Sequence, residues 1–143
     1  MGIRIRPLGI RDYTVLIELF RVCGLNPRVR GRDSRDAIAR QLRSFRSVYL
    51  GAFDGERLVG AVFGTHDGRK GWINRLAVRP EYRRRGIAVR LVRVCERRLR
   101  AAGIEMFAAL IEPGNEASET LFHALGYELL RLTYARKKLR REI

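Results

Sequence analysis

The stretch WINRLAVRPEYRRRGIAV, residues 72–89, decides the fold of this chain. It begins as an apolar strand, turns at Pro80, and reaches three arginines and Gly86 directly before a long amphipathic pattern. A glycine-containing turn that opens a helix directs unpaired N–H groups and the positive end of the helix dipole to one point. Small residues at Gly86 and Ala88 let this backbone approach a ligand. The stretch therefore predicts a site for a phosphate or pyrophosphate group.

A second pattern lies nearer the C-terminus. Asn115 precedes an apolar-periodic segment that contains Ser118, Leu121 and Phe122, and the pair Gly126-Tyr127 ends it. In residues 83–88, a basic residue is followed by two spacers, a glycine, one spacer and an alanine. This first pattern and the second one together resemble the two motifs of the Gcn5-related N-acetyltransferases (GNAT). The resemblance covers most of the chain from Val48 onward.

The order of predicted elements agrees with the fold that this resemblance implies. We expect an α/β protein with a mixed sheet, the GNAT-like acyl-CoA N-acyltransferase fold, in which two parallel strands splay apart and about four helices flank the sheet. The length of 143 residues predicts a single domain over residues 1–143. Strands are predicted at 3–6, 48–53, 57–65, 72–78, 106–111 and 128–134, and helices at about 15–24, 34–45, 86–102 and 115–125, with Phe45 on the apolar face of its helix.

The resemblance also implies how acetyl-coenzyme A binds. The pantetheine arm enters the gap between strands 72–78 and 106–111, and Asn115 and Phe122 lie near it. Asn115 is also a good helix N-cap, which alone explains its presence. The expected cofactor contacts are Leu76, Ala77 and Val78 for pantetheine, Arg83, Arg84, Arg85, Gly86, Ile87, Ala88 and Val89 for pyrophosphate, and Asn115 and Phe122.

The implied reaction is direct attack of an amine on the acetyl thioester. Family members usually protonate the departing thiolate with a tyrosine one turn before the Gly-aromatic pair, and this chain has Phe122 there. Alternative donors of this proton are water, Tyr127 and Tyr134. The predicted general base is Glu112, whose alternative role is a solvated acid in a turn, and Asn74 is a candidate for ordering a water instead.

The sequence does not select the acceptor, which is a protein N-terminus, a lysine or a small amine. Asn74, Arg75 and the loop 26–33 are the expected substrate contacts. The chain carries 30 Lys and Arg against 15 Asp and Glu, a net charge of +15, which favours acidic peptide or ribosome-bound acceptors over polycations. The basic residues of the long helix also fit an ordinary solvated face.

Binding without catalysis is the second hypothesis. The missing tyrosine would then mark a coenzyme A sensor, or a module that binds nucleic acid or the ribosome through its basic surface, for which residues 136–141 are the best candidate. A second copy of the chain is a further candidate partner.

Cys23 and Cys95 lie far apart without metal-ligand spacing, so we expect free thiols and no metal site. No apolar run reaches membrane-spanning length, and the N-terminus lacks a signal-peptide core. We therefore expect a cytoplasmic protein without a membrane partner.

Overall fold

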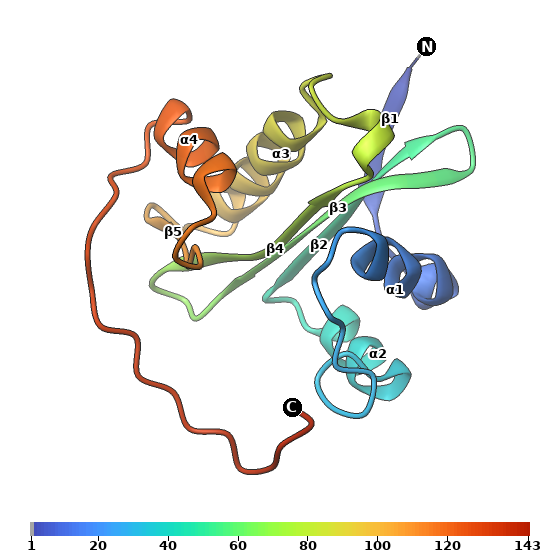
Figure 1. Ribbon diagram of the computed structural model, residues 1–143, viewed down its shortest axis with the longest axis horizontal. Coiled ribbons are helices and arrows are strands. Elements are labelled where there is room, and N and C mark those ends of the chain that lie inside the picture. Colours follow the sequence, from blue (N-terminus) through green and yellow to red (C-terminus); the bar gives the residue numbers. More distant parts are fainter. Residues whose placement is uncertain (1) are drawn as a thin grey trace.

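A mixed five-stranded sheet forms the centre of the computed structural model, which describes residues 2–143 (Figure 1). The strand order is β1-β2-β3-β4-β5; the first four strands are antiparallel, and β5 is parallel to β4. The strands are β1 (Ile3–Pro7), β2 (Ser47–Asp54), β3 (Arg57–His66), β4 (Gly71–Val78) and β5 (Phe107–Ala109). The helices are α1 (Tyr13–Val22), α2 (Arg35–Arg43), α3 (Ile87–Ala101) and α4 (Glu116–Ala124), with short 3-10 turns η1 (Ile10–Asp12) and η2 (Pro80–Tyr82).

Helices cover both faces of the sheet. α1 and α2 pack on one face, and α3 and α4 pack on the other (Figure 1). The apolar stripe predicted for the long helix is confirmed, since the side chains of α3 that face the sheet are buried: Ile87, Leu91, Val92, Cys95 and Leu99. The expected mixed sheet flanked by four helices is therefore the observed architecture.

Two glycines of β3 let α3 approach the sheet closely. A Cβ at Gly60 would lie 3.2 Å from the Leu91 side chain, and one at Gly64 would overlap the Cys95 sulfur. Residue 64 therefore has no room for a side chain. The close approach fixes the height of α3 above the sheet and hence the position of its N-terminus.

Three predictions about elements were wrong. α2 ends at Arg43, because Ser44 adopts an extended conformation, and Phe45 consequently leaves the helical periodicity and is 84% exposed. The fifth strand spans Phe107–Ala109 rather than residues 106–111, since only three residue pairs join it to β4, and Met106 and Leu110 are exposed. Residues 128–134 form no strand, because no neighbouring strand pairs with them in the described chain.

Within residues 2–143, no helix combines the length and apolar character that crossing a membrane requires.

Candidate functional site

The gap between β4 and β5 opens halfway along β4. Gly71, Trp72 and Ile73 pair with β5, and the strand then continues to Val78 without a partner on that side. On the other side, β4 stays paired with β3 as far as Val78. Beyond Ile73, the edge of β4 that faces the gap therefore presents backbone N–H and C=O groups that no neighbouring strand pairs with.

Leu76 and Val78 direct their backbone groups into this gap. Arg79 donates its N–H to the Val59 carbonyl, and alternate residues of an antiparallel strand direct their N–H and C=O groups to opposite sides. Ala77 consequently faces β3 with its backbone, whereas the groups of Leu76 and Val78 face away from β3. The Val78 carbonyl accepts from Arg83 Nε at 3.1 Å and from Cys23 Sγ at 3.4 Å.

The N-terminus of α3 lies directly beyond the end of β4. Gly86 is the N-cap residue, with φ of 78°, and no side chain caps the helix. The first helical hydrogen bond runs from Arg90 N–H to the Gly86 carbonyl, so the helix geometry leaves the N–H groups of Ile87, Ala88 and Val89 free of intrahelical partners. These N–H groups lie where the sequence predicts an anion cradle, and binding of a ligand there stays a prediction.

Open space lies beside Gly86, because a Cβ built there meets no atom within 4 Å. Arg84, with φ of 63°, and Gly86 turn the backbone sharply before the helix begins. Arg83, Arg84 and Arg85 are exposed, and the Arg85 guanidinium lies 4.9 Å above the Tyr82 ring. An anion at the cradle would meet both the helix dipole and these arginines.

Comparison with known proteins decides the family. The sequence profile of the acetyltransferase (GNAT) family matches residues 14–127. The chain belongs to the acetyltransferase (GNAT) family. It is 33% identical over 118 residues to acetyltransferase plu1384 of Photorhabdus laumondii, covering 82% of this chain and 80% of that protein. As a GNAT-type acetyltransferase, the chain has the activity class that the sequence predicts.

Solved structures support the fold. The PaiA N-acetyltransferase of Thermoplasma acidophilum, crystallised with coenzyme A, superposes with a TM-score of 0.83 at 23% identity, covering 93% of this chain and 94% of that chain. The aminoglycoside acetyltransferase AAC(6')-Iy, crystallised with a bisubstrate analogue, gives a TM-score of 0.80 at 20% identity, covering 96% and 99%. The GNAT fold extends over nearly the whole chain.

Phe122 lies inside the core of this GNAT domain rather than at its surface. The ring is 4% exposed and packs edge-on against Tyr127, with 4.9 Å between ring centroids. The Tyr127 hydroxyl donates to Glu96 Oε2 at 2.6 Å, and burial followed by this hydrogen bond raises its pKa. Tyr134 is 65% exposed on the C-terminal segment. The Tyr127 hydroxyl is therefore engaged by Glu96, and protonation of the thiolate by either tyrosine stays a prediction.

Glu112 and Asn115 lie together in the turn that leads from β5 to α4. Glu112 is exposed three residues beyond β5, and its carbonyl accepts from Asn115 N–H at 3.1 Å. The Asn115 side chain accepts from Ser118 N–H at 3.1 Å, so its role as the N-cap of α4 is confirmed. Its contact with a cofactor stays a prediction.

Asn74 and Arg75 differ in how free their side chains are. Asn74 is exposed and donates to Thr65 Oγ at 3.0 Å. Arg75 uses its guanidinium to fasten the loop after α1, since Nη1 donates to the Leu25 carbonyl at 2.9 Å and Nη2 donates to Asp33 Oδ2 at 3.0 Å. Arg75 is therefore a positioning residue of the loop in this structure.

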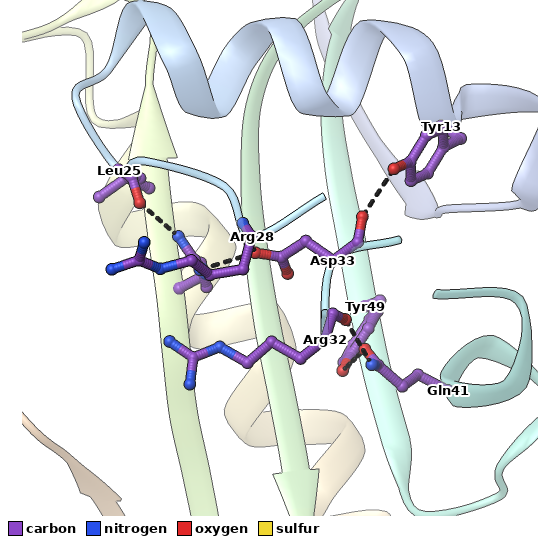
Figure 2. A network of polar contacts seen from close by, with 8 residues as sticks. Tyr13, Leu25, Arg28, Arg32, Asp33, Gln41 and Tyr49 are labelled. Atoms are coloured by element: carbon purple, nitrogen blue, oxygen red, sulfur yellow. Dashed lines mark hydrogen bonds and ion pairs between the residues drawn. The ribbon is translucent and has the colours of Figure 1, made fainter. Parts of the chain in front are cut away.

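Asp33 organises the loop from within, which sequence reasoning missed because it treated residue 33 as part of the loop 26–33. Its side chain is 4% exposed and also accepts the backbone N–H of Arg28 at 2.7 Å, while its carbonyl accepts from the Tyr13 hydroxyl (Figure 2). The actual cap of α2 is Ser34, which accepts from Ala37 N–H. Only the folded chain brings Asp33 to Arg75, forty-two positions away.

Cationic groups gather around Arg75. Burial lowers the pKa of its guanidinium, the Asp33 carboxylate acts against this, and the nearby Arg32 and Arg28 lower the pKa further. Figure 2 shows that the Arg28 and Arg32 side chains extend in the same direction, away from Asp33. Neither forms an ion pair with any residue from 2 to 143. Because the sequence predicts acceptor contacts at Arg75 and this loop, we call Arg28, Arg32 and Arg75 the acceptor-side cations.

Two further features bear on the site. A shallow hollow of about 350 Å³ between β2, Leu42 and the C-terminal end of α3 lies away from the gap and contains no residue of the cradle. In the described part of the chain, no three His, Cys, Asp or Glu side chains gather as a metal site would require. The backbone of β4 and α3, rather than a closed pocket, defines the candidate site.

Proposed function

We propose that residues 1–143 form one acetyltransferase domain that transfers the acetyl group of acetyl-coenzyme A to a primary amine by direct attack. The observation that carries this proposal is the position of the α3 cradle at the end of the unpaired edge of β4. An anion site and a strip of free backbone amides are continuous there. This combination suits a ligand with a pyrophosphate and an arm of two amide groups.

The residues present fit the pyrophosphate. The N–H groups of Ile87, Ala88 and Val89 supply donors at the positive end of the helix dipole, and Arg83, Arg84 and Arg85 supply charge. Gly86 leaves space on the ligand side. Leu76 offers its backbone N–H and carbonyl to the pantetheine amides, and Val78 offers its N–H, since the Val78 carbonyl already accepts from Arg83 and Cys23. Ala77 contributes through the packing of its side chain rather than through its backbone.

The bound cosubstrate supplies an acetyl thioester whose carbonyl carbon is open to attack by the acceptor nitrogen. The Val78 N–H faces the gap and is placed to donate to the acetyl oxygen. Glu112, or instead a water held by Asn74, accepts the proton that the acceptor ammonium releases. The C–S bond breaks as the C–N bond forms, and the nitrogen then loses its second proton to water. The departing thiolate takes its proton from water, because Phe122 has none to give.

The acceptor-side cations favour an acceptor that carries negative charge next to its amine. Arg28 and Arg32 lie near Arg75 without ion-pair partners, and such a cluster attracts carboxylates and repels polycations. We therefore propose an acidic peptide, presented by its N-terminus or a lysine, over a polycationic aminoglycoside of the kind that the name of the neighbour AAC(6')-Iy implies.

Titration of the protein with acetyl-coenzyme A, followed by thiol release with peptide and small amines, tests the proposal. Gly86→Glu places a carboxylate in the cradle and is expected to abolish binding. Gly55→Glu is the matched control, because Gly55 also has a positive φ of 60° and open space around it, but lies in the β2–β3 turn. Equal losses in both variants, or no binding by the parent chain, would contradict the proposal.

The buried Phe122 favours one alternative, a domain that binds coenzyme A or a ribosomal or nucleic-acid partner without efficient catalysis. Binding abolished by Gly86→Glu, together with thiol release no faster than hydrolysis across all acceptors, would select this alternative.

A further inference from the structure

The outward side of α3 carries a row of arginines. Arg93, Arg97 and Arg100 are exposed, and their helix spacings of four and three residues place neighbouring Cβ atoms about 5–6 Å apart. None of the three forms an ion pair with any residue from 2 to 143. The one acid of α3, Glu96, accepts from the Tyr127 hydroxyl instead. Like charges on adjacent turns repel, so this row weakens the helix in the free chain.

Phe45 presents an aromatic ring to solvent on an ordered turn. The ring is 84% exposed, two residues after the end of α2. Ser44 Oγ accepts from Arg46 N–H at 3.2 Å, and the Arg46 carbonyl accepts from His66 N–H at 3.1 Å, so the backbone on both sides of the ring is fixed. The Arg46 guanidinium carbon lies 5.4 Å from the centroid of the Phe45 ring. An exposed ring on a fixed backbone with a cation beside it suits stacking by a flat ligand.

The shallow hollow of about 350 Å³ connects this ring to α3. Its volume lies within the range of about 300–1,000 Å³ that small-ligand sites have. Arg98 is exposed, follows Arg97 directly and borders the hollow, so the positive charge of α3 continues to its rim. The residues that line the hollow from the two sides are Leu42, Phe45 and His66, and Arg98, Ala101 and Ala102.

The arginine row and the exposed ring together select the class of ligand. A row of arginines attracts polyanions, which include both acidic proteins and nucleic acids. A ring beside a hollow adds a place for a planar group, which the bases of a nucleic acid have and the carboxylates of an acidic protein lack. Stacking requires a base that is not paired, and unpaired bases are typical of the loops and ends of RNA. Charge and shape therefore favour a single strand of RNA.

We propose that this face binds a single-stranded segment of RNA, with its phosphates along Arg93, Arg97 and Arg100 and one base stacked on Phe45. Arg98 contacts the phosphate next to that base. The hollow contains no residue of the cradle, so the bound RNA leaves the cofactor gap open. The proposal is consequently independent of acetyl transfer.

The first test is fluorescence anisotropy of a labelled oligouridine of about twelve nucleotides, titrated with the full chain at several salt concentrations. The logarithm of the association constant is expected to fall against the logarithm of the salt concentration with a slope of about −2 to −3, because three or four phosphates are contacted. Binding that does not depend on salt, or no binding, would overturn the proposal. Equal affinity for the duplex with oligoadenylate would overturn the assignment to a single strand.

Arg93→Glu combined with Arg97→Glu is expected to raise the Kd for this RNA at least about tenfold, because two phosphate contacts become repulsive. The matched control is Arg11→Glu combined with Arg21→Glu, at exposed positions of η1 and α1 on the other face of the sheet. This control carries the same charge change and is expected to leave the Kd nearly unchanged. Equal losses in the two double variants would show that net charge alone attracts RNA.

Phe45→Leu keeps an apolar side chain but removes the ring, and it is expected to raise the Kd at least about fivefold, whereas Phe45→Trp retains the affinity. Equal affinities of these two variants would contradict stacking at this position. Polyglutamate of matched charge is added as a competitor, and displacement of the RNA as effective as that by unlabelled oligouridine would assign the face to an acidic protein instead. Circular dichroism of each variant shows that the fold is retained.

Discussion

Asp33 and Arg75 form a nearly buried ion pair, with 3.0 Å between Asp33 Oδ2 and Arg75 Nη2. It joins the loop before α2 to the strand that borders the cofactor gap. Because Asp33 also accepts the Arg28 N–H, one carboxylate sets both the shape of the loop and the positions of the acceptor-side cations.

Asp33→Ala is expected to destabilise the protein by about 3 kcal/mol, because it leaves the Arg75 charge buried without its partner. Urea unfolding measures this loss. Glu81→Gln, which breaks the exposed pair with Arg57, is the control and is expected to leave the free energy of unfolding unchanged. Similar midpoints for Asp33→Ala and the parent would show that the buried pair is not stabilising.

Charge reversal of Arg28 and Arg32 is expected to raise the KM for acidic peptide acceptors at least about tenfold and to leave the KM for acetyl-coenzyme A unchanged. Steady-state kinetics measure both KM values, with acidic peptides and neutral peptides of matched length as acceptors. Arg93→Glu combined with Arg97→Glu, at two exposed positions of α3, carries the same charge change on the opposite face of the sheet. A matching rise in the control would attribute the effect to net charge alone.

Phe122→Tyr is expected to increase the rate of thiol release, by up to about 100-fold, by restoring the proton donor that the family usually has at this position. The pH dependence of kcat should acquire a basic limb with the tyrosine. If the rate stays unchanged while the free energy of unfolding falls, the added hydroxyl faces the core rather than the gap.

Gly64→Ala is expected to destabilise the chain by about 1–3 kcal/mol, because the new methyl group overlaps the Cys95 sulfur beneath α3. Adding Cys95→Ala removes that sulfur and should recover part of the loss. Thermal unfolding of the two single variants and the double variant gives the coupling free energy between the substitutions at residues 64 and 95. Additive effects would mean that the clash is relieved elsewhere.

Acid is expected to weaken the Arg6–Asp12 pair. Burial acts to raise the pKa of Asp12, but hydrogen bonds from Arg6 and Gly9 hold it below its usual value. The pair therefore stabilises the fold above about pH 4 and loses this effect as pH falls through the lowered pKa. Asp12→Asn should flatten the dependence of unfolding free energy on pH below 4, and an unchanged dependence in this variant would contradict the prediction.

Local sequence signals predicted the core of the fold well, and the reasons are physical. The stripe of α3, the strands at 48–53 and 57–65 and the strand before Arg79 depend on the order of neighbouring residues. Local signals failed at Phe45 and at residues 128–134. The first depends on where a helix ends, and the second depends on whether a partner strand is within reach.

The sequence by itself determined most elements of the GNAT fold and the glycine turn at Gly86 that opens α3, because periodicity and a glycine turn act over a few residues. The tertiary structure alone decided the meeting of Asp33 with Arg75, the burial of Phe122 beside Tyr127, and the uncovered edge of β5. Each of these depends on segments distant in sequence, whose contacts follow from how helices and strands pack and not from any local pattern.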